Sequence, residues 1–146
     1  MTERRVLVLN GPNLGMLGAR EPEVYGTATL DDLEQACREA GESLGLTVEV
    51  RQTDDESKLV GWLHEAAIEA VPVVLNPAAF THYAYAVRDA CALVTTSGAR
   101  LIEIHLSNPA AREEFRHTSV IAAVATGTIA GFGSDSYLLA LRALVR

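Results

Sequence analysis

Long apolar runs, cysteine and positive charge are all scarce in this sequence, and each scarcity excludes a class of protein. The 146 residues contain no apolar stretch near the ~20 residues that a membrane-spanning helix needs. The net charge of −7 argues against nonspecific attraction to nucleic acid or anionic lipid, so an anionic ligand needs locally placed positive charge. Residues 1–5 lead directly into a strand-like segment without the features of a signal peptide, and we expect a cytoplasmic protein.

The chain has two cysteines, Cys37 and Cys91, and neither has the spacing of a metal ligand. Both lie in helical patterns among apolar residues, which predicts two buried, reduced thiols. What the chain does contain is 49% apolar and 21% charged residues. This composition can build a core, and the length predicts a single domain over residues 1–146.

Strand-like and helix-like patterns alternate along the chain. Short apolar or alternating runs predict strands at 6–9, 47–51, 73–75, 101–106 and 120–125. Helical periodicity predicts helices over 30–44, 59–70, 80–94 and 138–145, with a short helix starting at Pro109. Thr29 is the expected N-cap of the first helix and Gly45 its stop. Repeated β-α units predict an α/β fold: a flavodoxin-like, five-stranded parallel sheet flanked by helices on both faces.

Ligands of such sheets bind beyond the carboxyl ends of the strands. The first of these loops, residues 11–28, is rich in glycine and longer than a plain connection, so it is a candidate lid. It matches no phosphate-binding glycine motif. Arg20 precedes Tyr25 by five residues, and a nearby guanidinium lowers the pKa of a phenol from its usual value of about 10. The alternative is a solvated loop with a surface arginine and a packing tyrosine.

The fourth predicted strand carries two ionisable residues, Glu103 and His105. Alternation places both on the same face of the strand, with their Cα atoms about 6.6 Å apart from the ~3.3 Å rise per residue. A carboxylate beside an imidazole fixes the tautomer of the ring and stabilises its protonated form. The alternative is a buried structural ion pair. Two ionisable groups in an apolar strand are costly unless they are used, which makes a functional pair a real candidate.

The turn after this strand is a candidate anion site. Backbone N–H groups of Leu106 and Ser107 precede a predicted helix, where free N–H groups can hold a carboxylate. Arg112 lies in the first turn of that helix and adds positive charge. The alternative is ordinary helix capping by Ser107 or Asn108, and both interpretations can hold together.

The third strand ends at Asn76, with His82 near the start of the next predicted helix. Asp89 follows His82 by seven residues, two turns along the same helical face. The alternative for His82 is a structural hydrogen bonder. His64 and His117 have weaker contexts, and we interpret them as structural.

These segments together resemble type II 3-dehydroquinate dehydratases of the shikimate pathway, over nearly the whole chain from Val6 to Ala143. The residues at 10–26 closely follow the family signature N-G-P-N-L…L-G-x-R-E-P-x-x-Y-G. Further blocks match in the same order: 75–77 with 81–82, 88–90, 102–108 and 112–116. Two positions depart from the pattern, since Ala110 replaces a usual histidine and Ser136 replaces the last glycine of a late Gly-x-Gly-x-x-Gly-Tyr block.

The resemblance implies a dehydration of 3-dehydroquinate to 3-dehydroshikimate through an enolate. It implies that Tyr25, as a phenolate, removes the proton next to the ketone, and that Arg20 lowers the pKa of Tyr25 and closes over the substrate. Asn13 is implied to hold a water that stabilises the enolate. His105, supported by Glu103, is implied to be the general acid for the departing hydroxyl. Such an elimination needs a base, an enolate stabiliser and an acid.

The resemblance also implies how the substrate is bound and how subunits assemble. The binding residues that it implies are Asn76 and the backbone of Leu106 and Ser107 for the carboxylate, with His82 and Arg112 for ring hydroxyls. Asp89 is implied to reach into the site of a neighbouring subunit within a homododecamer, a tetramer of trimers.

No cofactor and no metal are expected, because the family needs neither and the sequence has no Cys/His ligand cluster. A Schiff base on lysine is not implied, and the single lysine, Lys58, lies away from every matched block. The alternative from a different class is a noncatalytic flavodoxin-like module that binds a flavin or nucleotide. The missing phosphate motif and the scarcity of aromatic residues, 5% of the chain, argue against it.

Overall fold

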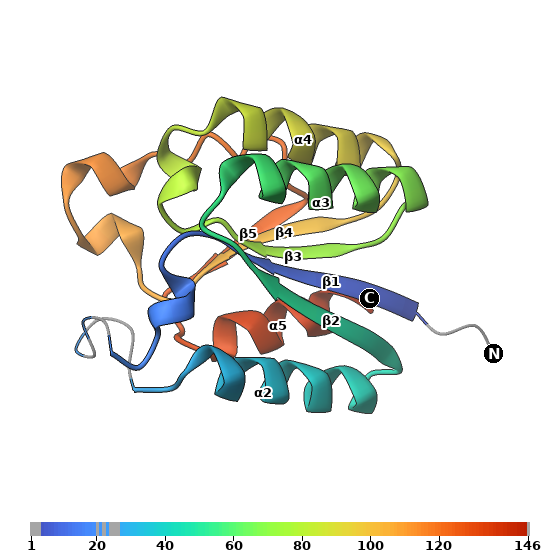
Figure 1. Ribbon diagram of the computed structural model, residues 1–146, viewed down its shortest axis with the longest axis horizontal. Coiled ribbons are helices and arrows are strands. Elements are labelled where there is room, and N and C mark those ends of the chain that lie inside the picture. The colour runs from blue at the N-terminus through green and yellow to red at the C-terminus, as the bar shows by residue number, and fades with distance from the viewer. Residues whose placement is uncertain (1–3, 20, 22, 24–26, 146) are drawn as a thin grey trace.

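The structure, a computed structural model, describes residues 4–19, 21, 23 and 27–145. Its centre is a parallel sheet of five strands in the order β2-β1-β3-β4-β5 (Figure 1). The strands are β1 (Arg4–Asn10), β2 (Leu46–Gln52), β3 (Val73–Asn76), β4 (Leu101–His105) and β5 (Gly127–Ala130). This order is the flavodoxin-like one, so the predicted fold class is confirmed.

Helices cover both faces of the sheet (Figure 1). One face carries α2 (Leu30–Ser43) and α5 (Asp135–Leu144), and the other carries α3 (Glu56–Glu69) and α4 (Tyr85–Thr96). The described residues also form four short 3₁₀ helices: η1 (Leu14–Met16), η2 (Ala78–His82), η3 (Pro109–Ala111) and η4 (Glu114–His117). They gather with their loops at the carboxyl ends of the strands (Figure 1).

Burial on both faces of the sheet explains why the sequence of strand β1 is a continuous apolar run. Leu7 and Leu9 pack into the core cluster beneath α3 and α4, whereas Val6 and Val8 pack into the cluster beneath α2 and α5. All four are at most 1% exposed. A strand of a parallel sheet that is covered on both faces loses the polar alternation, while the edge strand β2 keeps it, as predicted.

Helix α2 begins and ends where the sequence predicts. The hydroxyl of Thr29 accepts the N–H of Asp32 at 3.1 Å, and the Asp32 carboxylate accepts the N–H of Thr29 at 3.0 Å. This capping box satisfies two backbone donors at the helix start. At the other end Gly45 has φ 75°, the left-handed conformation that glycine adopts without strain.

The fifth strand was predicted wrongly at 120–125, because β5 lies at Gly127–Ala130. The segment before it forms turns, with Ile121 fully buried against the α3 and α4 side of the core while Ala122 and Ala123 are exposed. The apolar side chain that covers the core here is thus supplied by a turn and not by a strand. Composition alone cannot distinguish such an apolar run from a strand.

The helix predicted over 80–94 is also wrong at its start. Residues 78–82 form η2, Ala84 has the non-helical angles φ −84° and ψ 85°, and α4 begins at Tyr85. His82 and Asp89 therefore do not share one helical face.

Both cysteines are buried free thiols, as predicted. Burial raises the pKa of Cys37 and of Cys91 to about 12, so both stay neutral. Within the part of the chain that the structure describes, no helix is both long and apolar enough to cross a bilayer.

Candidate active site

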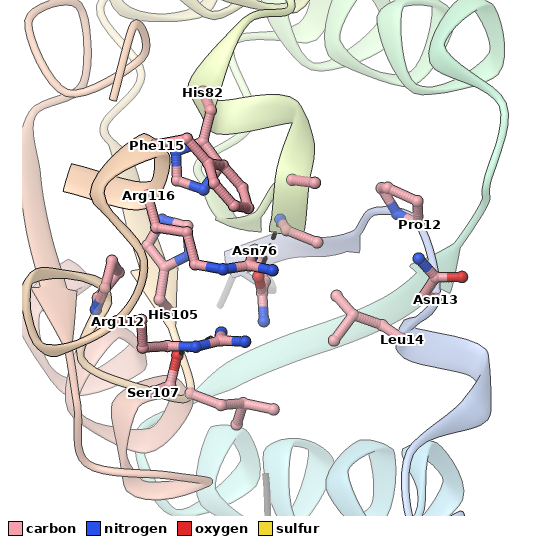
Figure 2. A pocket seen from close by; sticks show the side chains of 14 residues that line it. Pro12, Asn13, Leu14, Asn76, His82, His105, Ser107, Arg112, Phe115 and Arg116 are labelled. Atoms are coloured by element: carbon pink, nitrogen blue, oxygen red, sulfur yellow. Dashed lines mark hydrogen bonds between the residues drawn. The ribbon is translucent and has the colours of Figure 1, made fainter. Parts of the chain in front are cut away.

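A cavity of about 270 Å³ lies beyond the carboxyl ends of β1, β3 and β4 (Figure 2). This volume is near the lower end of ligand pockets, about 300–1,000 Å³, which suits a small metabolite. Seven residues singled out in the sequence line it: Asn13, Asn76, His82, His105, Leu106, Ser107 and Arg112. The other lining residues are Pro12, Leu14, Ala78, Ala79, Pro109, Phe115 and Arg116.

Gly11 allows the ends of β1 and β3 to meet at this cavity. Its N–H donates to the carbonyl oxygen of Asn76 at 2.8 Å. A Cβ at Gly11 would lie 2.5 Å from the carbonyl oxygen of Pro77, closer than van der Waals contact permits. Only glycine fits there without moving backbone, so the glycine of the Asn-Gly-Pro turn has a steric cause.

Asn13 follows this turn in a left-handed conformation, φ 69°. Asparagine tolerates that conformation better than most residues. The carboxylate of Asp54 accepts the Asn13 N–H at 2.9 Å and a hydrogen bond from Gln52 Nε2 at 3.1 Å. The loop after β2 therefore fixes the backbone that presents Asn13 to the cavity.

His105 lies on the wall of the cavity and Glu103 lies behind it, as the alternation along β4 predicts. His105 Nε2 is 2.6 Å from Glu103 Oε2, and Glu103 is 1% exposed. Burial by itself raises the pKa of Glu103, but hydrogen bonds from His105, Thr81 and Ser119 lower it overall. A carboxylate only accepts hydrogen bonds, so Nε2 carries a proton and Nδ1 is the ring nitrogen left for a ligand.

Positive groups gather on the same side of the cavity. The guanidinium carbon of Arg116 lies 4.5 Å from the centre of the Phe115 ring, and the Phe115 and His82 rings are nearly perpendicular with their centres 5.8 Å apart. Figure 2 shows Arg112 and Arg116 extending towards the middle of the cavity, with Asn13 on the opposite wall. An acidic protein thus places cations locally, which is what binding an anionic substrate requires.

The turn after β4 combines the two interpretations that the sequence left open. Asn108 caps η3, since its side chain accepts the N–H of Ala110 at 3.2 Å. Ser107 is engaged differently, because its hydroxyl accepts from Arg112 Nη1 at 3.2 Å. The predicted helix is only one 3₁₀ turn, and Arg112 follows its end instead of lying in its first turn.

Asn76 is oriented by a buried chain of hydrogen bonds. Asn76 Nδ2 donates to the Tyr137 hydroxyl at 2.9 Å, which donates to Asn10 Oδ1 at 2.6 Å, and Asn10 Nδ2 donates to the carbonyl oxygen of Arg51 at 3.0 Å. The N–H of Ala78 donates to Asn76 Oδ1 at 3.2 Å. Backbone groups at both ends fix the direction of the hydrogen bonds, and the Tyr137 hydroxyl both accepts and donates in the middle.

Replacing Tyr137 by phenylalanine should lower the free energy of unfolding by about 2–6 kcal/mol, measured by urea denaturation at pH 7. The phenol is 1% exposed, so its loss leaves Asn10 Oδ1 and Asn76 Nδ2 buried without partners, at about 1–3 kcal/mol each. The matched control is Tyr85→Phe, whose phenol is 68% exposed and for which we expect a change below about 0.5 kcal/mol. Equal stability of the two variants would contradict a stabilising role for this chain of hydrogen bonds.

Among the predicted site residues that the structure describes, Asp89 is separated from the others. Asp89 lies on α4 with a side chain 73% exposed, paired with Arg88 at 2.8 Å, and does not line the cavity of its own chain. Tyr25 and Arg20 lie outside the described residues. Glu21, which the structure does describe, lies 3.7 Å from Arg112 of the cavity.

Sequence reasoning missed four residues that the structure brings to the site: Phe115, Arg116, Ser119 and Tyr137. Arg116 carries one usable signal, since it follows Arg112 by four residues and neighbours an aromatic residue. The roles of Ser119 and Tyr137 depend on contacts with residues 16 and 61 positions away. Tyr137 ends the late Gly-x-Gly-x-x-Gly-Tyr block, but that pattern does not show what its hydroxyl contacts. Across the described part of the chain, no three His, Cys, Asp or Glu side chains form a group that could hold a metal ion.

Comparisons with known proteins agree with this geometry. The model of the class II dehydroquinase family matches residues 4–145. A 3-dehydroquinate dehydratase of Salinispora tropica is 63% identical over 140 residues, which cover 96% of each chain. The solved type II dehydroquinase of Propionibacterium acnes superposes with a TM-score of 0.94 at 56% identity, covering 97% of this chain and 96% of that one. The type II dehydroquinase of Butyrivibrio crossotus gives a TM-score of 0.94 at 39% identity and covers 99% of both. The chain therefore belongs to the class II dehydroquinase family.

Proposed function

We propose that this protein dehydrates 3-dehydroquinate to 3-dehydroshikimate by anti elimination through an enolate, with Tyr25 as the base and His105 as the general acid. The observation that carries the proposal is the pair formed by His105 and the buried carboxylate of Glu103, 2.6 Å apart on the wall of a cation-lined cavity. Family membership supports the substrate and the reaction.

His105 serves the second half of the reaction. Once the enolate has formed, its electrons expel the hydroxyl on the neighbouring carbon, and the protonated imidazole gives that hydroxyl a proton from Nδ1, so water leaves. Glu103 holds the Nε2–H and compensates the charge of the imidazolium. A positioned acid of this kind contributes roughly 10²–10⁴-fold to the rate.

The cavity supplies groups suited to a carboxylate and several hydroxyls. Asn76, with the backbone of Leu106 and Ser107, is proposed to bind the substrate carboxylate. His82 and Arg112 are proposed to bind ring hydroxyls. The His82 ring is already fixed, because its Nδ1 donates to the carbonyl oxygen of Thr118 at 2.8 Å and leaves Nε2 for the ligand.

Tyr25 and Arg20 complete the proposal on the strength of the family resemblance. Tyr25, as a phenolate, takes the proton next to the ketone, and Arg20 favours the phenolate through its charge. Asn13 lines the opposite wall and is proposed to hold a water that stabilises the enolate. Stabilisation of the developing oxyanion by fixed donors is commonly the largest part of such catalysis.

Assembly is part of the proposal. Asp89 is exposed on α4 and does not line its own cavity, which suits a residue that serves the site of a neighbouring subunit. A homododecamer, a cytoplasmic location and catalysis without a cofactor stay predictions. No observation favours the noncatalytic flavin or nucleotide module, since Phe115 is the sole aromatic side chain among the described residues that line the cavity.

The direct test is to mix the purified, chelator-treated protein with 3-dehydroquinate and follow enone absorbance without any added cofactor. We expect steady formation of 3-dehydroshikimate. Borohydride added with substrate should leave activity intact, because Lys58 does not line the cavity and no Schiff base is expected. A His105→Asn preparation made in parallel controls for a contaminating host enzyme. Wild-type protein that gives no more product than this control contradicts the proposal.

A further inference from the structure

The carboxylate of Glu103 is held by three separate elements of the fold. His105 Nε2 reaches Oε2 from β4 at 2.6 Å, and the hydroxyl of Thr81 reaches Oε2 from η2 at 2.5 Å. The hydroxyl of Ser119 lies 2.9 Å from Oε1 and 3.0 Å from Oε2, in the segment between η4 and β5. Thr81 and Glu103 are each 1% exposed, so these contacts replace water almost completely.

The hydrogen bonds around Ser119 determine where its single hydroxyl proton goes. Ser119 Oγ accepts the N–H groups of Ile121 at 3.1 Å and of Ala122 at 3.0 Å, so both of its lone pairs are used. Its proton therefore points to Glu103 or to the Thr81 oxygen, 2.7 Å away. In either arrangement a hydroxyl proton is donated to the carboxylate, and such donors favour the ionised form.

We propose that Ser119, with Thr81, is a positioning residue for the reaction put forward under Proposed function, on which this inference rests. The two hydroxyls keep Glu103 ionised and aligned. Glu103 then holds the Nε2–H of His105 and leaves Nδ1 directed at the substrate.

The same segment also positions the second imidazole of the cavity. The carbonyl oxygen of Thr118 accepts from His82 Nδ1 at 2.8 Å, and the N–H of Val120 donates to the carbonyl oxygen of Thr81 at 2.7 Å. Residues 118–120 thus hold η2 in place. They thereby fix the hydroxyl contacts that Thr81 and Ser119 make to Glu103, and the tautomer of His82. These residues directly precede Ile121, within the run 120–125 that was wrongly predicted as a strand.

Few other titratable groups face Glu103. On α4, burial and then the charge of Glu103 raise the pKa of Cys91 to about 12, so that thiol stays neutral. His82 on η2 and the guanidinium groups of Arg112 and Arg116 line the same cavity. The arginines stay charged throughout the working range of pH, so a change in the acid limb reports on Glu103 and the two imidazoles, and the NMR titration described below identifies the contribution of Glu103.

The test compares kcat across pH for Ser119→Ala and Thr81→Val, the latter removing a hydroxyl while keeping the side-chain shape. We expect kcat to fall about tenfold and its acid limb to move up by about one pH unit, because the carboxylate has lost a donor. Thr81→Ser keeps the hydroxyl, so kcat and the position of its acid limb should both return to the wild-type values. Ser97→Ala is the matched control, since Ser97 is an exposed turn serine after α4 whose hydroxyl donates to the carbonyl oxygen of Val94. It should leave the profile unchanged.

Two further measurements separate positioning from mere folding. In a Glu103→Gln background, Ser119→Ala should lower kcat by less than about twofold, because residues that act as one unit are not additive. Carboxyl ¹³C NMR of Glu103 should show its titration at higher pH in Ser119→Ala, a readout that needs no activity. An inactive wild type would refute the proposed function and still allow the NMR test. The positioning role is overturned if Glu103 titrates at the same pH in Ser119→Ala as in the wild type. It is also overturned if Ser119→Ala lowers kcat as much in the Glu103→Gln background as in the wild type.

Discussion

Replacing His105 by asparagine is expected to lower kcat by about 10²–10⁴-fold, the usual contribution of a positioned general acid. The ring lies on the cavity wall, and no other described side chain pairs with Glu103 from the cavity side. Because His105 acts on the departing hydroxyl, the variant should keep the first step. In D₂O it should still exchange the proton next to the ketone, which ¹H NMR of the unreacted substrate measures.

The control for this variant is His64→Asn. His64 is exposed on α3 and does not line the cavity, so kcat should change less than about twofold. If His105→Asn turned over substrate at the wild-type rate, the general acid would have to be another group. If the variant lost proton exchange as well as turnover, His105 would be needed in the first step too.

The parallel sheet could be predicted from the sequence because its signals are local. Apolar runs separated by helical periodicity give strands and helices, and right-handed crossovers leave few strand orders. The same local logic placed Glu103 beside His105, since a strand alternates its side chains regardless of the rest of the fold. It was wrong at 120–125, where Ile121 fills the core from a turn, and at 80–84, where a 3₁₀ turn precedes α4.

The remainder of the site could not be predicted because it is built from contacts between distant segments. Ser119 reaches Glu103 across 16 residues, Tyr137 reaches Asn76 across 61 and Asn10 across 127. Serine and tyrosine are common residues, and nothing in their neighbours shows what a fold will bring to them. Arg112 was predicted to lie in the first turn of a helix, which is wrong because that helix is a single 3₁₀ turn that ends before it. Arg112 nevertheless lines the cavity.

Replacing Tyr25 by phenylalanine should abolish detectable turnover, a fall of at least about 10³-fold, with little change in the unfolding midpoint. The described residues that line the cavity include two imidazoles and two guanidinium groups but no carboxylate and no phenol. His105 is assigned the role of the acid, and the family resemblance assigns the base to Tyr25. Glu21, four residues before Tyr25 in the sequence, pairs with Arg112 of the cavity at 3.7 Å.

The two halves of the reaction make this prediction separable from the one for His105. Tyr25→Phe should lose both turnover and proton exchange in D₂O, whereas His105→Asn loses only turnover. Tyr85→Phe, which removes an exposed phenol on α4, is the matched control and should keep both. Exchange at the wild-type rate in Tyr25→Phe would move the role of base to another group, with His82 Nε2 the first candidate because its other nitrogen is held by Thr118. Removing the base that begins the reaction should stop proton exchange, whereas removing the acid that ends it should leave exchange intact. The pair of variants therefore tests the order of the steps as well as the residues that perform them.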